Sequence, residues 1–342
     1  MARPRAAAAR RPATGTTVKD VARLAGVSPI TVSRALSAPN RLSAQTLERV
    51  RGAIRETGYV PNLLAGGLRS ARSRLVAAVV PTITGPVFLD TVQALTDALD
   101  AKGYQLMLGQ SGYRASREDA LIDAIIGRRP SGIVLTGMMR SKEGRRRLTA
   151  SGIPVVETWD LTPRPIDMVV GFSHERIGEA VAAFLHARGR SRPAIISGDD
   201  QRALRRVEGF RKAARRLGWS TSIPVETVPA PTTLAAGRAS LERLLSAHDG
   251  IDAIFASSDL LALGVLMQAQ SMRIEVPGRL AIVGFGDLSL LAGVAPALTT
   301  VRIDGPRMGR LAAACIIDRA EGREVTERVV DVGFSIVERE TT

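Results

Sequence analysis

Cysteine and histidine are scarce in this 342-residue sequence, which holds one cysteine and three histidines. The single cysteine, Cys315, lies in an apolar stretch, so the chain can form no internal disulfide and no cysteine cluster, and we expect a buried thiol. The histidines, at positions 174, 186 and 248, do not have the spacing of metal ligands. We therefore expect no metal site and no cofactor.

Long apolar runs are also absent. No stretch approaches the roughly 18 to 20 apolar residues that cross a membrane. The longest apolar run near the N-terminus, residues 6–9, is too short for the hydrophobic region of a signal peptide. We expect a cytoplasmic protein with no membrane partner.

Acidic residues are few in the first part of the chain. Residues 1–74 contain 14 lysines and arginines against three acids, which is a net charge of +11 out of +14 for the whole sequence. Residues 1–15 show no apolar periodicity and are expected to form a disordered basic arm. A basic segment suits nucleic acid, an anionic membrane or simple solubility, and charge alone does not separate these alternatives.

Three short helices are predicted over residues 16–60. Cap residues begin them at Thr17, Ser28 and Ser43, and glycines stop the first and third at Gly26 and Gly58. Helices this short, with a tight turn between the first two, indicate a helix-turn-helix unit. The segment 61–74 that follows is glycine-containing and is interpreted as a hinge.

From residue 75 onward, short apolar runs alternate with amphipathic helices, which predicts an α/β domain. We expect two doubly wound parallel-sheet lobes, residues 75–172 and about 173–300, with the chain crossing back near 300. A ligand cleft is expected between the lobes, at the carboxyl ends of the strands. The expected strands are 75–80, 104–108, 132–135, 154–156, 194–196, 253–255 and 280–283, and the expected helices include 87–101, 176–187, 207–217, 234–247 and 259–270.

The run TVKDVARLAGVSPITVSRAL at residues 17–36 closely resembles the DNA-binding head of the LacI/GalR family of repressors. The likeness continues to Asn62 and covers the later domain more loosely. The resemblance implies a periplasmic-binding-protein-like effector domain, a homodimer and an inverted-repeat operator in double-stranded DNA. It therefore predicts a sequence-specific transcriptional regulator, a repressor controlled by a small molecule.

In such repressors the second helix enters the major groove. The resemblance implies base-edge contacts from Pro29, Ile30 and Arg34, and a further contact from Arg41 in the following loop. Arg34 can pair bidentately with guanine, hold a phosphate, or be a solvated surface arginine. The other implied DNA contacts, whose hydroxyls and amides suit phosphates, are Thr17, Ser28, Thr31, Ser33, Ser43 and Asn62.

Leu68 matches the family leucine that wedges into the minor groove and kinks the DNA. The alternative is that Leu68 packs under the regulatory domain. Gly66 and Gly67 depart from the commoner hinge, and each costs about 1 kcal/mol in a helix. We expect this hinge to be disordered away from DNA.

The resemblance also implies effector contacts. Arg206 stands before Gly209 as does the family arginine that clamps the effector, and a guanidinium suits a carboxylate or vicinal hydroxyls. His174 occupies a place where asparagine is common in the family. Asp287 is the second position of a pair that is often acidic in the family, and only this second position is acidic here. Asp259 either caps a helix or contacts the ligand. Further residues expected at the cleft, with core packing as the alternative for the first two, are Val87, Phe88 and Trp159.

Three short segments narrow the resemblance. WDLT at 159–162, PIDM at 165–168 and GFS at 171–173 are similar to the gluconate-repressor subgroup. They predict a sugar or sugar acid such as gluconate as the effector.

Two other functions fit an α/β domain. An enzyme is disfavoured, because GFG at 284–286 lacks the rest of a dinucleotide fingerprint, no phosphate loop occurs and no catalytic set is found. A secreted sugar-binding protein with no DNA role is disfavoured by the missing signal peptide and the basic head.

Overall fold

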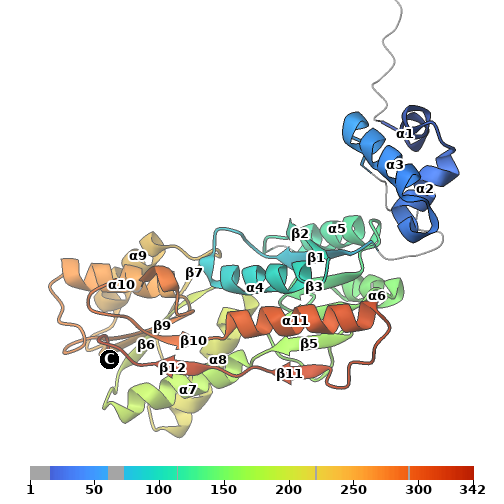
Figure 1. The fold of residues 1–342 in the computed structure, drawn as a ribbon. Helices are drawn as coiled ribbons and strands as arrows, with labels where there is room; N and C mark the ends of the chain where they lie inside the picture. The colour runs from blue at the N-terminus through green and yellow to red at the C-terminus, as the bar shows by residue number, and fades with distance from the viewer. Residues whose placement is uncertain (1–15, 61–72, 114, 220–221, 292) are drawn as a thin grey trace, which may run out of the picture. The chain divides into compact units, whose positions relative to one another are not determined.

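The computed structural model describes residues 16–60, 73–113, 115–219, 222–291 and 293–342 (Figure 1). Asn62, Leu68 and the expected arm at 1–15 lie outside the described residues. The chain divides into two compact units, Met1–Ser73 and Arg74–Thr342.

The first unit is a bundle of three helices, each of which begins at a polar cap. Ser28 Oγ accepts a hydrogen bond from the Thr31 N–H at 3.1 Å, and Ser43 Oγ accepts one from the Thr46 N–H at 3.3 Å. Apolar side chains on the inner helix faces, such as fully buried Val32, form the core. The elements are α1 (Val18–Ala25), α2 (Pro29–Ser37), the 3₁₀ turn η1 (Pro39–Arg41) and α3 (Ala44–Thr57).

The turn between α1 and α2 is held from the third helix. Gly26 has φ 61°, a left-handed conformation that favours glycine. The Arg49 guanidinium donates to the carbonyls of Ala25 at 2.6 Å and Gly26 at 3.1 Å. These bonds satisfy carbonyls at the end of α1 and fix α2 relative to α3.

The second unit contains two sheets, and we call the part built on the first sheet the first lobe (Figure 1). This sheet is wholly parallel, in the order β11-β5-β4-β3-β1-β2. Its strands are β1 (Leu75–Val80), β2 (Gln105–Gln110), β3 (Gly132–Thr136), β4 (Val155–Thr158), β5 (Met168–Gly171) and β11 (Val329–Asp331). Its helices are η2 (Pro86–Phe88), α4 (Leu89–Asp100), α5 (Ala115–Ile126), α6 (Lys142–Ser151) and α11 (Gly305–Ala320).

Both faces of the first sheet are covered. Alternate residues of β1 point to opposite faces, so that Val76 and Ala78 belong to the core beneath α4 and α11, whereas Ala77 and Val79 pack with α5 and α6. Burial on both faces explains why β1 is a continuous apolar run instead of an alternating one.

The second lobe is built on the sheet β12-β10-β9-β8-β6-β7, in which only β12 is antiparallel. Its strands are β6 (Pro193–Gly198), β7 (Val225–Val228), β8 (Ala253–Ala256), β9 (Ala281–Phe285), β10 (Thr299–Arg302) and β12 (Ser335–Val337). Its helices are α7 (His174–Ala187), α8 (Gln201–Arg216), α9 (Leu234–Ala247), α10 (Asp259–Ser271) and η3 (Ser289–Leu291). Two doubly wound parallel-sheet lobes confirm the predicted fold class.

The chain passes between the lobes three times. It leaves the first sheet after β5 and enters α7 at His174, and it returns after β10 to form α11. It then adds β11 to the first sheet beside β5 and ends in the second sheet, where β12 pairs with β10. This third passage, from β11 to β12, was not expected from the sequence.

Glycines allow α7 and α8 to cross at close range. A β-carbon on Gly178 would lie 2.0 Å from the Arg206 carbonyl oxygen, and one on Gly209 would lie 2.0 Å from the Glu175 carbonyl oxygen. The crossing therefore has no room for larger residues, and it brings Arg206 on α8 beside His174 on α7.

We expect Gly209→Ala to lower the free energy of unfolding by about 1–3 kcal/mol, because the methyl group forces two packed helices apart. Thermal denaturation of the full chain would measure the loss. Gly127→Ala is the matched control, since its β-carbon would meet the nearest atom at an ordinary 3.4 Å. Equal stability of Gly209→Ala and wild type would mean that the crossing relaxes at little cost.

Candidate functional site

One face of α2 in the first unit is exposed and carries the residues expected to touch DNA bases. Val32 and Ala35 are buried, whereas Pro29, Ser33 and Arg34 are exposed. Ile30 on the same face is 70% exposed, which is unusual for a large apolar side chain. This face therefore offers an apolar contact surface beside a cation.

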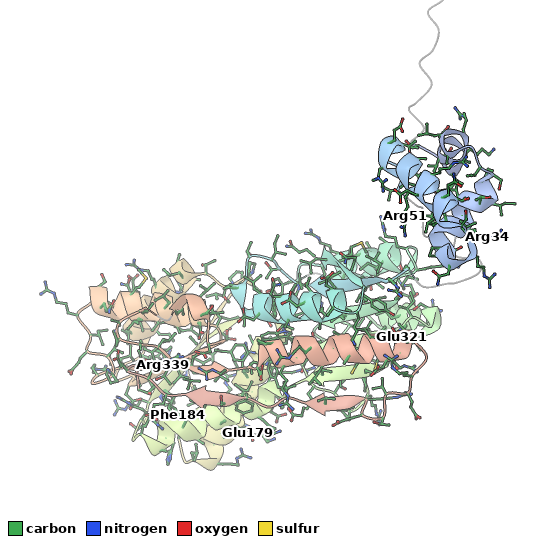
Figure 2. The ribbon with its side chains drawn as sticks, in the orientation of Figure 1. Arg34, Arg51, Glu179, Phe184, Glu321 and Arg339 are labelled. Atoms are coloured by element: carbon green, nitrogen blue, oxygen red, sulfur yellow. The ribbon has the colours of Figure 1, made fainter. Side chains whose placement is uncertain are left out.

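Several cations of this unit have no carboxylate partner among the described residues. Asp20 pairs with Arg23, and Glu48 pairs with Arg55. Arg34 and Arg51 extend from the unit as exposed side chains (Figure 2), and no ion pair engages them in the described part of the chain. Free guanidinium groups of this kind suit phosphates and guanine edges.

Three of the predicted phosphate contacts in this unit, Thr17, Ser28 and Ser43, also serve as helix caps. Thr17 Oγ1 donates to Asp20 at 2.6 Å, and the Ser28 and Ser43 hydroxyls each contact a threonine hydroxyl at 2.9 Å. Thr31 is half-buried, and Arg41, which follows α2 in η1, is exposed. Contact with DNA by Asn62 and Leu68 stays a prediction, because they lie outside the described residues.

A cavity lies between the two lobes of the second unit, and it measures about 700 Å³ when the solvent-open space at its mouth is included. It sits at the carboxyl ends of strands from both sheets: Trp159 follows β4, Ser257 follows β8 and Phe285 ends β9. This is the position expected for a ligand in doubly wound folds. Of the predicted effector residues, those that line the cavity are Val87, Phe88, Trp159, Arg206 and Asp259.

Arg206 is a buried cation with one donor left free. It is 4% exposed, and its Nη2 donates to the Ser257 carbonyl at 2.9 Å while its guanidinium lies 4.0 Å from the centre of the Phe285 ring. Burial lowers its pKa to about 10, so it remains charged at neutral pH. Its Nε has no hydrogen-bond partner, and no carboxylate of the described residues lies at ion-pair distance, although the more distant Asp200 and Asp160 act to raise its pKa.

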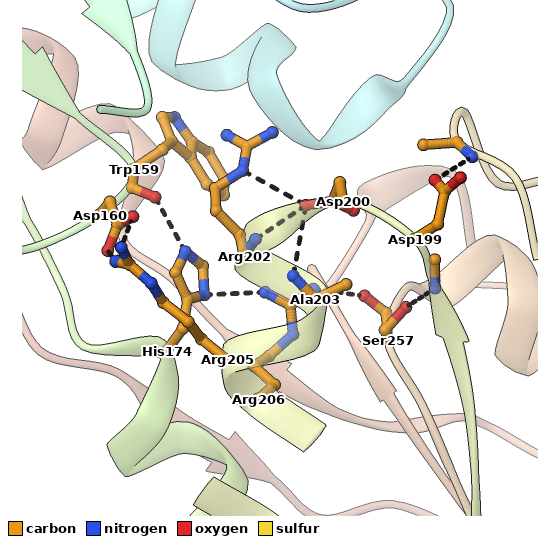
Figure 3. A network of polar contacts seen from close by, with 12 residues as sticks. Trp159, Asp160, His174, Asp199, Asp200, Arg202, Ala203, Arg205, Arg206 and Ser257 are labelled. Atoms are coloured by element: carbon orange, nitrogen blue, oxygen red, sulfur yellow. Dashed lines mark hydrogen bonds and ion pairs between the residues drawn. The ribbon is translucent and has the colours of Figure 1, made fainter. Parts of the chain in front are cut away.

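His174 contacts Arg206 and does not line the cavity. Its Nδ1 lies 2.7 Å from Arg206 Nη1, and its Nε2 lies 2.9 Å from the Trp159 carbonyl oxygen (Figure 3). Burial, followed by the Arg206 and Arg202 charges, lowers its pKa well below the usual value. His174 is therefore neutral and acts behind the cavity wall.

Two neighbouring arginines of α8 were not among the predicted site residues. Arg202 lines the cavity with its guanidinium 5.1 Å from the centre of the Phe88 ring, and its Nη1 is buried without a partner. Arg205 instead pairs with Asp160 of the first lobe, with Nη1 at 2.8 Å from each carboxylate oxygen. The sequence signal for this pair was the four-residue separation of Arg202 and Arg206, which places both side chains on the same face of a helix.

The two predicted acids have different surroundings. Asp259 does not cap α10, contrary to one of the alternatives, because the Ser258 Oγ accepts from the Leu261 N–H. Its carboxylate instead accepts from Thr300 Oγ1 at 2.6 Å, and burial raises its pKa to about 6. Asp287 is absent from the lining of the 700 Å³ cavity.

The carboxylate of Asp287 pairs with Arg302 and with Arg339, the latter at 2.6 Å. Each carboxylate oxygen of Asp287 therefore already has a cationic partner. In the described part of the chain, no helix is long and apolar enough to span a bilayer, and no cluster of three acidic, histidine or cysteine side chains could hold a metal ion.

Comparisons with known proteins agree with this arrangement. Residues 17–62 match the model of the lacI family of bacterial regulatory proteins, and residues 182–342 match a periplasmic binding protein-like domain. The HTH-type transcriptional regulator GntR of Pseudomonas aeruginosa is 38% identical over 95% of each chain.

Solved structures are similar along the whole chain. A LacI family transcriptional regulator from Silicibacter pomeroyi has a TM-score of 0.90 and 32% identity, covering 95% of this chain and 99% of its own. The transcriptional regulator CelR in complex with cellobiose has a TM-score of 0.70 and 29% identity, covering 96% and 100%. The chain therefore belongs to the LacI family of bacterial transcriptional regulators.

Proposed function

We propose that this regulator represses transcription by binding an inverted-repeat operator in double-stranded DNA as a homodimer, and that a small sugar acid controls its operator affinity. The observation that carries the effector class is the free Nε of buried, unpaired Arg206 at the wall of the interlobe cavity. A buried cation with no ion pair of its own is costly, and an anionic ligand would reduce that cost.

We assign DNA recognition to residues 16–60. The exposed face of α2 with Ile30 and Arg34 has the dimensions and chemistry to enter the major groove, where Arg34 would read guanine and Ile30 a thymine methyl. Residues 61–74 would be the hinge that carries Asn62 and Leu68, and residues 75–342 the effector and dimerisation domain. Two heads on a twofold axis require an inverted repeat.

The lining of the cavity fits a six-carbon sugar acid in its chemistry, with a few polar groups set among apolar and aromatic side chains. Arg202 and Arg206 supply unpaired N–H donors for a carboxylate, and aromatic rings such as Trp159 suit the C–H faces of a polyol. The bound cellobiose of similar CelR and the GntR name of a relative support a sugar-like ligand of the gluconate type.

Control of DNA binding requires that the ligand bind two lobe arrangements unequally. A tenfold change in operator affinity corresponds to a difference of about 1.4 kcal/mol between the two binding free energies. Such a ligand needs no chemical conversion, and the relatives are named regulators, so we assign the chain no enzymatic activity. A regulator that binds operator DNA would act in the cytoplasm.

We expect Arg34→Ala to weaken binding to the cognate operator by about 1–3 kcal/mol and to leave binding to scrambled DNA nearly unchanged, because one bidentate guanine contact is lost. Fluorescence anisotropy at fixed salt would measure both affinities. Arg51→Ala is the matched control, since it removes an equally exposed charge from α3. Equal losses from the two variants on both DNAs would exclude base recognition by Arg34.

We expect wild type to bind gluconate more tightly than the neutral alditol, and Arg206→Met to lose at least tenfold in gluconate affinity, because the carboxylate loses its charged donor. Calorimetric titration with gluconate, its phosphate, the alditol and glucose would test the class. Arg211→Met, an exposed position on the same helix, keeps wild-type affinity. Tight binding of a neutral sugar, with an affinity that Arg206→Met does not change, would exclude the sugar-acid proposal.

We expect gluconate affinity to rise as the pH falls from 8 to 6. Asp259 lines the cavity with a pKa of about 6, so acidification removes a negative charge beside the anionic ligand. Arg206 stays charged and His174 stays neutral over this range. Titrations at several pH values would show the trend, and Asp259→Asn would abolish it. Affinity that falls on acidification would contradict the proposal.

A further inference from the structure

The His174 ring is hydrogen-bonded on both of its nitrogens, and the two partners determine its protonation. A guanidinium only donates, so Nδ1 accepts from Arg206 Nη1 at 2.7 Å. A carbonyl only accepts, so Nε2 carries the proton and donates to the Trp159 carbonyl at 2.9 Å. The ring is therefore a neutral imidazole with an acceptor facing one lobe and a donor facing the other.

The bond to Trp159 crosses between the lobes. Trp159 follows β4 of the first lobe, whereas Arg206 lies on α8 of the second lobe. His174 itself is the first residue of α7, directly after the passage from β5. Figure 3 shows the ring between the Trp159 carbonyl and the Arg206 guanidinium. One side chain thus joins the effector-binding cation to the opposite wall of the cavity.

Trp159 is itself held in an unfavourable backbone conformation. Its φ is 59°, in the left-handed region that residues with a β-carbon rarely adopt. Bonds to two helices of the first lobe hold it there: its N–H points to Met308 Sδ on α11 at 3.3 Å, and its indole N–H donates to Thr91 Oγ1 on α4 at 3.2 Å. Strain of this kind persists only where the surroundings over-determine it, and it is common at switch regions.

The α4–α11 packing leaves Trp159 little freedom to move alone. A β-carbon on Gly309 would lie 2.4 Å from the Thr91 carbonyl oxygen, so these helices touch directly at the residue that binds the indole. A shift of the Trp159 carbonyl therefore acts on both helices at once.

We infer that His174 is a positioning residue that orients Arg206 toward the effector and ties that orientation to the first lobe through the Trp159 carbonyl. This role rests on the proposed function of the cavity. With one N–H of Nη1 held by His174 and one N–H of Nη2 held by the Ser257 carbonyl, the other N–H groups of Arg206, Nε–H among them, are the donors left for a carboxylate. Any lobe movement that breaks the Trp159 bond leaves its carbonyl and the His174 Nε2–H unpaired, so the bridge favours one lobe arrangement over the other.

The charges around the ring favour this neutral, bridging form. The groups that face His174 are the Arg202, Arg205 and Arg206 cations, the Trp159 carbonyl, and the rings of Phe172 and Phe285. A protonated ring would turn Nδ1 into a donor against the Arg206 guanidinium. The bridge is therefore maintained across the physiological pH range.

Two substitutions separate the two halves of the bridge. The amide oxygen of His174→Asn can replace Nδ1 as the acceptor for Arg206, but its side chain is too short to reach the Trp159 carbonyl. The longer amide of His174→Gln can place its N–H₂ where Nε2 was, but it removes the acceptor beside Arg206. His248→Asn, an exposed histidine at the end of α9, is the matched control.

The test measures gluconate affinity by calorimetry and the factor by which gluconate changes operator affinity, on the full-length chain with an operator selected from random DNA. We expect the gluconate affinity of His174→Asn to stay within threefold of wild type. We expect the factor by which gluconate changes operator affinity to be at least fivefold smaller in this variant than in wild type. We expect His174→Gln to lose at least tenfold in gluconate affinity with unchanged affinity for the neutral alditol. His248→Asn should match wild type in both measurements.

Wild-type values for both His174 variants, or equal losses in both measurements from the two variants, would overturn the inference while the gluconate site stands. Failure of the wild type to bind any sugar acid would instead overturn the proposed effector class, and this role with it. Thermal denaturation of each variant would show that the fold is retained in the samples compared.

Discussion

The Arg206 guanidinium is buried at the interlobe cavity with no carboxylate at ion-pair distance among the described residues, and the groups around it have to accommodate its charge. A charge in a low-dielectric site needs polar partners, and here they are all neutral: the His174 ring, the Ser257 carbonyl and the face of the Phe285 ring. None of these partners carries a negative charge, and Nε is buried without a hydrogen-bond partner. A ligand that supplies an acceptor or a negative charge here would complete these contacts, which is the physical basis of the proposed effector class.

The placement of this cation depends on how the lobes are joined. Three passages of the chain and a close crossing of α7 and α8 at Gly178 and Gly209 bring residues from distant parts of the sequence to one cavity wall. Asp160 and Arg205 add an ion pair across the same boundary. Binding at the cavity and the arrangement of the lobes are thus parts of one network, as a regulator requires.

Much of this could be predicted from sequence where local signals exist, and little where they do not. Caps at Ser28 and Ser43 and the left-handed Gly26 depend on neighbouring residues, so the first unit was predictable. β1 is a buried apolar run, whereas β11 is a three-residue edge strand with exposed side chains that exists only because it pairs with β5. Asp259 resembled a helix cap in sequence, yet its carboxylate bonds to Thr300, 41 residues away.

The sequence by itself determined the helix-turn-helix unit, the β-α alternation, the family and the identity of Arg206 as a cavity residue, because caps, periodicity and motifs act over a few residues. Tertiary structure alone decided that Arg206 has no ion-pair partner among the described residues, that His174 lies behind it as a neutral bridge, and that Asp287 pairs with Arg302 and Arg339. Desolvation and hydrogen-bond pairing depend on which distant residues meet, and only the packed fold specifies that.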